Sequence, residues 1–381
     1  MIFDTRFSEK ESIRYGVVDG TATIVKYEGD EMRVVIPASI DGFKVTKIEP
    51  YAFSEKSMKY IQFPDTLEVI DHHGFSECRE LLNLDFPDSL KSIGNYAFYN
   101  CWALEQVHLT AHIRSIGFGA FKNCEKLSEI IQDKIEGLDI SIGSILDDLN
   151  QQIHVILRHL YPDKPVEEAR VIFTEHDYEV VANVASMCKQ FESTEIGSGK
   201  YIQDVDYYKY DSMFYVLLRG DSFDTIITVA MERLMYPYAL TLEGEHTYKG
   251  YIAEHALEAA KKFIQEDDKD KLTFLVDLGV LDSDETDQTI DLALSLDKTE
   301  FTAFLMDYKH RNFSMADESF DSDKDLLIFD SVETWKKTTL KGGTYHVREL
   351  LVPVFKNGEC VYTSPSVMDI REYCKREQET L

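Results

Sequence analysis

A short motif, Ile-Gly-x-x-Ala-Phe-x-x-Cys-x-x-Leu, recurs in degenerate form with a period of about 23 residues. The copies begin at Ile48, Ile70, Ile93 and Ile116. In register they form one phenylalanine column and one cysteine column, made of Phe53, Phe75, Phe98, Phe121, Cys78, Cys101 and Cys124. A fixed period of this length predicts stacked repeats, because no single copy can bury its apolar columns alone.

A short alternating run follows each of the first three copies. The runs are Ile61-Gln62-Phe63, Leu84-Asp85-Phe86 and Val107-His108-Leu109. Alternation predicts one β-strand per repeat, with successive side chains pointing inward and outward, and stacking would join these strands in a parallel sheet. Pro64 and Pro87 end the first two strands, because proline cannot donate to a ladder. The outward candidates for a binding face are Tyr60, Gln62, Asn83, Asp85, Gln106 and His108.

These columns resemble the BspA-type leucine-rich repeats, over roughly residues 14–131. Tyr15-Gly16-Val17-Val18-Asp19-Gly20 and Gly42-Phe43-Lys44-Val45-Thr46 fit the lead-in of that family. The resemblance implies a solenoid scaffold with an exposed strand face, and it names no ligand. The cysteine column invites a disulfide or a metal, but a ladder of buried reduced thiols is the interpretation we favour, because cysteine packs well as a small apolar residue.

The net charge of the chain excludes some classes of partner. The formal net charge is −29, which argues against nucleic acid and anionic lipid as partners, since both require a basic surface. Residues 132–313 carry 36 acidic and 17 basic side chains, a pattern that predicts solvated helix surfaces. No apolar run approaches the roughly 20 residues of a membrane helix. The first residues lack the apolar region of a secretory signal, so we expect a cytoplasmic protein.

The middle of the chain changes from strand alternation to helical spacing from about Ile153. Residues 224–234 predict a helix that stops near Pro237, and Gly279 suits the left-handed position after another helix. Residues 290–294 and 299–305 are similar to a degenerate ankyrin-type helix pair that lacks the Thr-Pro-Leu-His signature. We therefore predict stacked antiparallel helices to residue 313, with an irregular loop from Glu192 to Asp206.

The last 65 or so residues follow neither pattern. Two strands, Arg348–Phe355 and Cys360–Tyr362, are predicted to meet at the turn Asn357-Gly358, and a helix is predicted from Val367 to Glu379. Residues from about 315 to 381 closely resemble the C-terminal segment of bacterial nicotinate phosphoribosyltransferase. The matching stretches include Ala316-Asp-Glu-Ser-Phe-Asp321 and Arg348-Glu-Leu-Leu-Val-Pro-Val-Phe-Lys-Asn-Gly358.

That second resemblance implies a link to NAD salvage, in which the family makes nicotinate mononucleotide from nicotinate, phosphoribosyl pyrophosphate and ATP. Its catalytic residues lie in an upstream barrel, which residues 1–313 do not resemble, so no catalytic residue is carried over. Two origins fit the composite: a true fusion, and a truncated or misjoined reading frame.

Other motifs fail on spacing. Gly197-Ser-Gly-Lys200 has one residue between its glycines and Tyr201 after the lysine, whereas a phosphate loop needs four residues and then Ser or Thr. His72-His73 is interpreted as part of an exposed turn, because neighbouring side chains diverge. His154 and His159, on a predicted helix, lack the i, i+4 relation of a zinc site. No catalytic residue, metal ligand or cofactor is predicted.

These observations predict an α+β protein with three parts. They are a leucine-rich repeat solenoid with a parallel sheet (residues 1–131), an acidic α-helical repeat domain (132–313) and a small αβ segment (314–381). We expect a non-catalytic scaffold that binds an unidentified protein partner. A repeat array that merely covers the helical domain stays open as an alternative. So does a component or remnant of nicotinate phosphoribosyltransferase.

Overall fold

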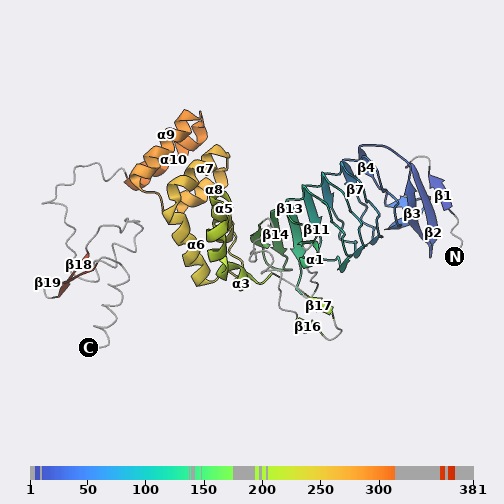
Figure 1. Cartoon of the computed structure of the whole chain (residues 1–381), viewed down its shortest axis with the longest axis horizontal. Helices are drawn as coiled ribbons and strands as arrows, with labels where there is room; N and C mark the ends of the chain where they lie inside the picture. Colours follow the sequence, from blue (N-terminus) through green and yellow to red (C-terminus); the bar gives the residue numbers. More distant parts are fainter. Residues whose placement is uncertain are drawn as a thin grey trace. The chain divides into compact units, whose positions relative to one another are not determined.

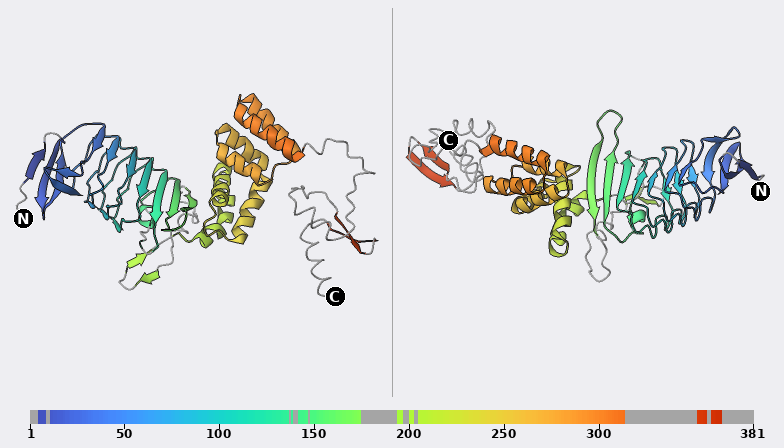
Figure 2. Two further views of the ribbon diagram at one scale, coloured as in Figure 1. Left: turned by 180° about the vertical axis from the view of Figure 1, so that it is seen from behind. Right: turned by 90° about the horizontal axis from the view of Figure 1, so that it is seen from above.

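The computed structural model describes residues 5–8, 11–136, 138, 142–146, 148–174, 194–196, 200–202, 205–313, 352–356 and 359–364. The chain forms two compact units, Met1–Tyr251 and Ile252–Leu381. Figure 1 shows the successive coils of the first unit side by side, and the view from above in Figure 2 shows them in the same order. The fold is α+β, with a β-solenoid followed by helices, as the sequence predicts.

The first sheet of the solenoid has the order β1-β2-β3-β6-β8-β10-β12, with β5 paired on β6. Its strands are β1 Thr5–Ser8, β2 Ile13–Val18, β3 Thr21–Tyr27, β5 Ser39–Ile40, β6 Phe43–Ile48, β8 Val69–Ile70, β10 Ser92–Ile93 and β12 Ser115–Ile116. Pairing is antiparallel up to β3 and parallel from β3 through β12. The lead-in hairpins therefore begin a sheet that the repeats continue.

The second sheet has the order β15-β14-β13-β11-β9. Its strands are β9 Asn83–Asp85, β11 Gln106–Leu109, β13 Glu129–Lys134, β14 Ile153–His159 and β15 Glu167–Phe173, and the separate pair β4 Arg33–Val35 and β7 Tyr60–Gln62 lies beside β9. The pairs β9–β11 and β11–β13 are parallel and one period apart. This confirms that the alternating runs form a parallel sheet. The expectation of one strand per repeat is wrong, because the repeats also contribute the two-residue strands β8, β10 and β12 to the first sheet.

The core between the sheets holds the phenylalanine column as a stack of rings. Ring centroids are 4.8 Å apart between Phe53 and Phe75, 5.3 Å between Phe75 and Phe98, and 5.4 Å between Phe98 and Phe121. The cysteine column lies beside it. The thiols of Cys78, Cys101 and Cys124 donate at 3.1, 3.3 and 3.3 Å to the carbonyl oxygens of Phe53, Phe75 and Phe98. These three cysteines are free and buried, which confirms the thiol ladder.

The helical expectation from Ile153 is wrong. Residues after the short helix α1 Gly143–Leu146 form β14, which pairs in parallel with β13, and then β15, which pairs with β14 antiparallel. Ile153, Val155 and Leu157 are all buried, so the burial alternates with the period of a strand. His154 and His159 therefore lie on a strand rather than a helix. Residue 131, where we expected the solenoid to end, falls within β13.

The predicted irregular loop from Glu192 to Asp206 is also corrected. It contains the short antiparallel pair β16 Thr194–Ile196 and β17 Lys200–Ile202.

Four helices complete the first unit or begin in it: α3 Tyr207–Ser212, α4 Phe214–Gly220, α5 Phe223–Met235 and α6 Leu242–Glu254. α5 matches the predicted helix and ends before Pro237. A buried ion pair joins α3 and α5, because Arg233 donates to both carboxylate oxygens of Asp211 at 2.8 and 2.9 Å. The Tyr248 hydroxyl on α6 donates to the same carboxylate at 2.8 Å.

The second unit contains helices α7 Ala256–Gln265, α8 Lys269–Asp277, α9 Ser283–Ser295 and α10 Thr299–Phe313. α8 is capped by Asp268, α9 begins with a capping box of Asp282 and Glu285, and Gly279 takes a φ of +66°, as predicted for a residue after a helix. Helical repeats are only weakly developed, and the ankyrin-type resemblance stays a prediction. Among the described helices, none has the length and apolar character needed to span a bilayer.

Near the end of the chain, β18 Val352–Lys356 and β19 Glu359–Ser364 form an antiparallel pair, as predicted around Asn357-Gly358. The helix predicted from Val367 to Glu379 lies outside the described residues.

Candidate functional site

The outward side chains of the second sheet and of β4–β7 form two rows across the coils, which we call the strand face. The first row is Arg33, Tyr60, Asn83, Gln106, Glu129 and His154, and the second is Val35, Gln62, Asp85, His108, Ile131 and Ile156. All six residues predicted from the sequence lie here. Tyr60, Gln62, Asn83 and Asp85 are exposed, while Gln106 and His108 are half-buried.

Strand alternation produces this face. Leu84 and Val107, between the outward residues, are almost completely buried. Residues one period apart become direct neighbours across the sheet, so Asp85 lies opposite His108, and Gln106 lies opposite both Asn83 and Glu129. The Gln106 amide donates to the Glu129 carboxylate of the next coil. Side chains of neighbouring coils in the outward row are therefore joined by a hydrogen bond.

An apolar and aromatic patch lies at the β4–β7 end of the strand face. Met32 is 53% exposed, Val35 57% and Tyr60 38%, and the guanidinium carbon of Arg33 lies 4.6 Å from the centre of the Tyr60 ring. Sequence reasoning missed Met32, Arg33 and Val35. The signal was present, because Val34-Val35-Ile36-Pro37 repeats the strand-then-proline pattern of Leu84-Asp85-Phe86-Pro87.

His108 joins three coils at the centre of the strand face. Its Nδ1 lies 2.8 Å from Oδ1 of Asp85, and its Nε2 lies 3.1 Å from Oδ2 of Asp133. Arg158 on β14 extends the network, 3.3 Å from the other Asp133 oxygen. Both ring nitrogens face acceptors, which the doubly protonated ring satisfies. The hydrogen bond to Asp133 is the largest influence and raises the pKa of His108; burial opposes it and Asp85 reinforces it.

The two carboxylates that hold His108 differ in exposure. The Asp133 side chain is 11% exposed, whereas that of Asp85 is 84% exposed. Asp133 was missed because it lies on β13, past the third alternating run, where no further repeat was read. Its residue type carries no signal in an acidic chain, and only the stacking of coils places it beside His108.

The last strand of the sheet is covered. Ala169 on β15 forms an isolated bridge with Pro237, and Arg170 lies 3.7 Å from the centre of the Tyr236 ring while pairing with Glu168 at 3.2 Å. A hollow of about 610 Å³ is lined there by Glu167, Glu168 and residues 235–239. The segment after α5 therefore shields the edge of β15 from further strand pairing.

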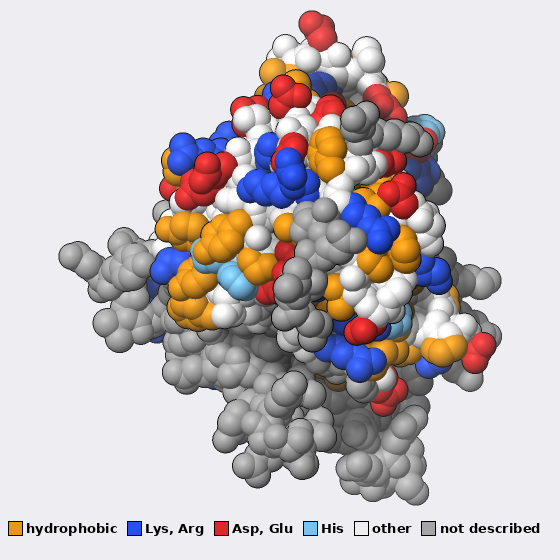
Figure 3. Space-filling view, turned by 90° about the vertical axis from the view of Figure 1, so that its right-hand side faces the viewer, with side chains coloured by type: hydrophobic (Ala, Val, Ile, Leu, Met, Phe, Trp, Pro, Cys, Tyr) orange, Lys and Arg blue, Asp and Glu red, His pale blue; other side chains and the backbone are white. Residues whose placement is uncertain are grey.

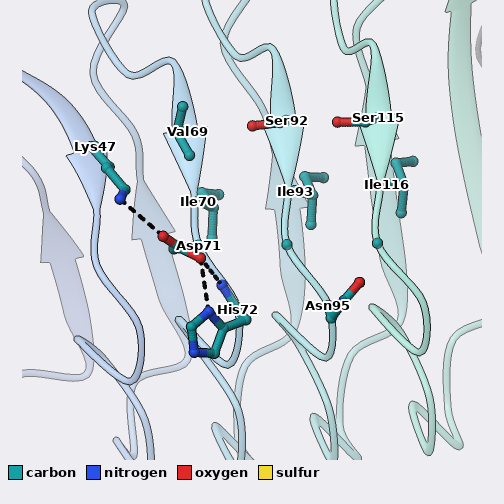
Figure 4. A pocket seen from close by; sticks show the side chains of 12 residues that line it. Lys47, Val69, Ile70, Asp71, His72, Ser92, Ile93, Asn95, Ser115 and Ile116 are labelled. Carbon is teal, nitrogen blue, oxygen red and sulfur yellow. Dashed lines mark hydrogen bonds and ion pairs between the residues drawn. The ribbon is translucent and has the colours of Figure 1, made fainter.

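A second hollow, of about 590 Å³, lies on the outer surface of the first sheet. Figure 4 shows Lys47 and His72 converging on Asp71, at 2.9 Å each, with Ser92 and Ser115 on neighbouring coils. Gly94 forms part of the lining, where a Cβ would lie 2.4 Å from the backbone nitrogen of His72. The glycine is thus required by coil packing, and the charged groups of this hollow already satisfy one another.

The remaining motifs do not assemble a metal site. His72 is exposed and His73 half-buried, and their rings are 80° apart in orientation. His73 instead stacks between Tyr51 at 4.8 Å and Tyr96 at 5.3 Å. Among the described residues, no group of three or more His, Cys, Asp or Glu side chains could hold a metal ion. Residues 197–199 of the rejected phosphate-loop motif lie outside the described residues.

Acidic and basic side chains are interspersed with hydrophobic ones on the described part of the surface in Figure 3, which views the molecule from the side that carries the N-terminus in Figure 1. That surface therefore shows no broad field of a single sign.

Two family models match parts of the chain. Residues 46–141 match the BspA type leucine-rich repeat region in six copies, and residues 305–381 match the nicotinate phosphoribosyltransferase C-terminal domain. Both resemblances expected from the sequence are thereby confirmed. No curated protein matches the chain.

Solved structures of leucine-rich repeat proteins are similar to part of the chain. A leucine-rich repeat protein of T. pallidum is 26% identical, with 35% of this chain and 78% of that chain covered and a TM-score of 0.29. One from Bacteroides capillosus is 22% identical, with 34% and 97% covered and a TM-score of 0.30. The pneumococcal vaccine antigen PcpA is 20% identical, with 35% and 41% covered and a TM-score of 0.29.

Proposed function

We propose that this chain, which is similar to BspA-type leucine-rich repeats over residues 46–141, is a non-catalytic scaffold that binds a protein partner through the strand face. The observation that carries the proposal is the pair of outward rows, where polar and aromatic side chains are held on a rigid stack of strands. Rigid side chains lose little conformational entropy when they bind, so such a surface is suited to a protein partner.

The proposal is tested by comparing the partners of three proteins. A face variant carries Gln62→Ala, Asp85→Ala and His108→Ala. A control variant carries Lys44→Ala and Ser115→Ala, at two exposed positions on strands of the first sheet. Affinity capture followed by quantitative mass spectrometry should show partners that the face variant loses and the control variant keeps.

An unchanged partner list in the face variant would refute binding through this surface. If the repeats merely cover the rest of the chain, the face variant instead shows a lower melting temperature with no change in partners.

We propose a component or remnant of nicotinate phosphoribosyltransferase as the second candidate function, because residues 305–381 match the C-terminal domain of that enzyme. The assay measures nicotinate mononucleotide formed from nicotinate, phosphoribosyl pyrophosphate and ATP, by the chain alone and by the chain mixed with cell extract depleted of the intact enzyme. Absence of product in both removes this candidate. Sequencing the adjoining DNA separates a fusion from a misjoined reading frame.

A cytoplasmic location is also proposed, as expected from the sequence. Fractionation of cells that carry a tagged chain tests it, and recovery of the tag with the envelope fraction would contradict it.

A further inference from the structure

We infer that the strand face receives a basic, extended segment of its partner, whose Lys or Arg side chain binds Asp85 and whose apolar side chain packs against Val35 and Tyr60. The inference rests on the proposed function and names the chemistry of the partner. It also assigns His108 the role of an internal competitor for Asp85.

Asp85 is the carboxylate that a partner can reach. Its side chain is 84% exposed. Only Oδ1 contacts His108, so Oδ2 can accept a hydrogen bond from a partner. Gln62, one period earlier in the same row, is uncharged. Asp133 is unsuitable because its side chain is 11% exposed and contacts both His108 and Arg158. A cationic side chain is therefore the complementary group at this point of the face.

The apolar patch supplies the anchor. Met32, Val35 and Tyr60 are exposed together with Arg33, and Tyr, Met and Arg are enriched where proteins bind one another. Val35 and Asp85 belong to the same row, on β4 and β9, with β7 between them. Two strand spacings are about 10 Å, which an extended chain spans with about three residues. The partner segment should thus carry its basic and apolar side chains about three residues apart.

The charge of His108 decides how available Asp85 is. The groups that face the imidazole or its partners are Asp85 on β9, Asp133 and Glu129 on β13, and Arg158 and His154 on β14, with uncharged Gln106 on its own strand. While protonated, His108 neutralises Asp85. When it loses the proton, Asp133 keeps Arg158 as a partner, but Asp85 loses its cation.

The affinity for a basic segment should therefore rise as pH increases through the raised pKa of His108. Lysine and arginine side chains keep their charge across this range, so the change in affinity follows the charge of His108. The net charge of −29 adds a general attraction for basic partners, and this attraction also grows as the 11 histidines lose their protons near neutrality. The part of the pH effect that belongs to His108 is therefore the part that its replacement removes.

The test selects a displayed library of random peptides on the full-length chain at about pH 8, then measures the affinity of enriched peptides by fluorescence anisotropy at about pH 6 and pH 8. Enriched peptides should share a Lys or Arg about three residues from an apolar residue. Their affinity should be higher at the upper pH.

Variants locate the effect. Asp85→Asn should weaken binding about threefold to tenfold at the higher pH. The matched control is Asp88→Asn, at an aspartate that is 81% exposed and lies past the end of β9, and it should leave affinity unchanged. His108→Gln should raise the affinity at about pH 6, because Asp85 then has no internal cation, and should thereby reduce the difference in affinity between about pH 6 and pH 8. Circular dichroism melting confirms that each variant is folded.

Enrichment of acidic or uncharged peptides, no enrichment, or equal effects of Asp85→Asn and Asp88→Asn would overturn the inference. If partners identified by affinity capture still depend on the strand face in those cases, the proposed function stands and only the chemistry assigned to the partner is wrong. If the peptide test fails and the captured partners do not depend on the strand face either, the proposed function is wrong as well.

Discussion

Phe98 is the residue whose truncation tests the account of the solenoid most directly. Its ring is fully buried and stacks on Phe75 at 5.3 Å and on Phe121 at 5.4 Å, with Phe86 at 5.7 Å. The change Phe98→Ala removes one ring from the middle of the column and leaves a cavity between two coils. In a repeat array each coil is stabilised by its neighbours, so one cavity weakens the interfaces on both sides.

The expected loss follows from burial and stacking. Truncating a buried phenylalanine to alanine costs about 3–5 kcal/mol. We expect the upper half of that range, about 4–5 kcal/mol, because the ring has aromatic neighbours on both faces. Domains are stable by only about 5–15 kcal/mol, so this is a large fraction of the total. Phe118→Ala is the matched control, since Phe118 is 68% exposed, and it should change stability by about 0.5 kcal/mol or less.

The assay is urea unfolding followed by tryptophan fluorescence. The chain has two tryptophans, so a Trp335→Phe background leaves Trp102, four residues after Phe98 in the same coil, as the reporter. A difference of less than about 1.5 kcal/mol between Phe98→Ala and Phe118→Ala would refute the reasoning, because it would mean that the column does not carry the stability of the coils.

Three further predictions concern buried or coupled groups. Asp211→Ala leaves the Arg233 guanidinium buried without its carboxylate, so urea unfolding should show a loss of about 3–5 kcal/mol; a loss below about 1 kcal/mol would contradict this. His108 has a raised pKa in the folded chain. The stability that it adds relative to His108→Gln should therefore be complete below its unfolded pKa of about 6.5 and should decline as pH rises through the folded pKa. Urea unfolding from about pH 5.5 to 8.5 measures this difference, and an advantage of the wild type that grew with pH would contradict the prediction. Burial raises the pKa of the Cys101 thiol well above its ordinary value. In a variant whose other cysteines are serine, iodoacetamide should therefore label Cys101 at neutral pH only when the chain unfolds. Equal labelling rates with and without urea would argue against the buried ladder.

The repeat period was sufficient to predict the solenoid over the four copies that begin at Ile48, Ile70, Ile93 and Ile116. A spacing of about 23 residues placed the Phe98 and Cys101 columns in the core and Asp85 on the surface, because each coil repeats the same local pattern. The same reasoning failed from Ile153 onward. Alternation in Ile153, Val155 and Leu157 was present, but a short apolar run fits a buried strand and a buried helix alike. Only its pairing with β13 decided for the strand.

The candidate site was predicted in part. All six outward residues were placed on one face, since period-two alternation alone determines the side of a strand. Asp133 and the patch around Val35 were missed for different reasons. The patch had a readable signal in its strand-then-proline pattern, whereas Asp133 gains its meaning only from the coil that stacks beside it.

The sequence by itself determined the stacked architecture, the inward columns, the outward rows and the excess of acid, because each depends on residue type and on local spacing. Tertiary structure alone decided which charges meet. Asp85 and His108 are 23 residues apart, and His108 and Asp133 are 25 apart, so their contacts exist only when coils stack in one register. The ionisation of His108 and the exposure of the Asp85 carboxylate depend on how neighbouring coils cover them, and this covering is a property of the assembled sheet.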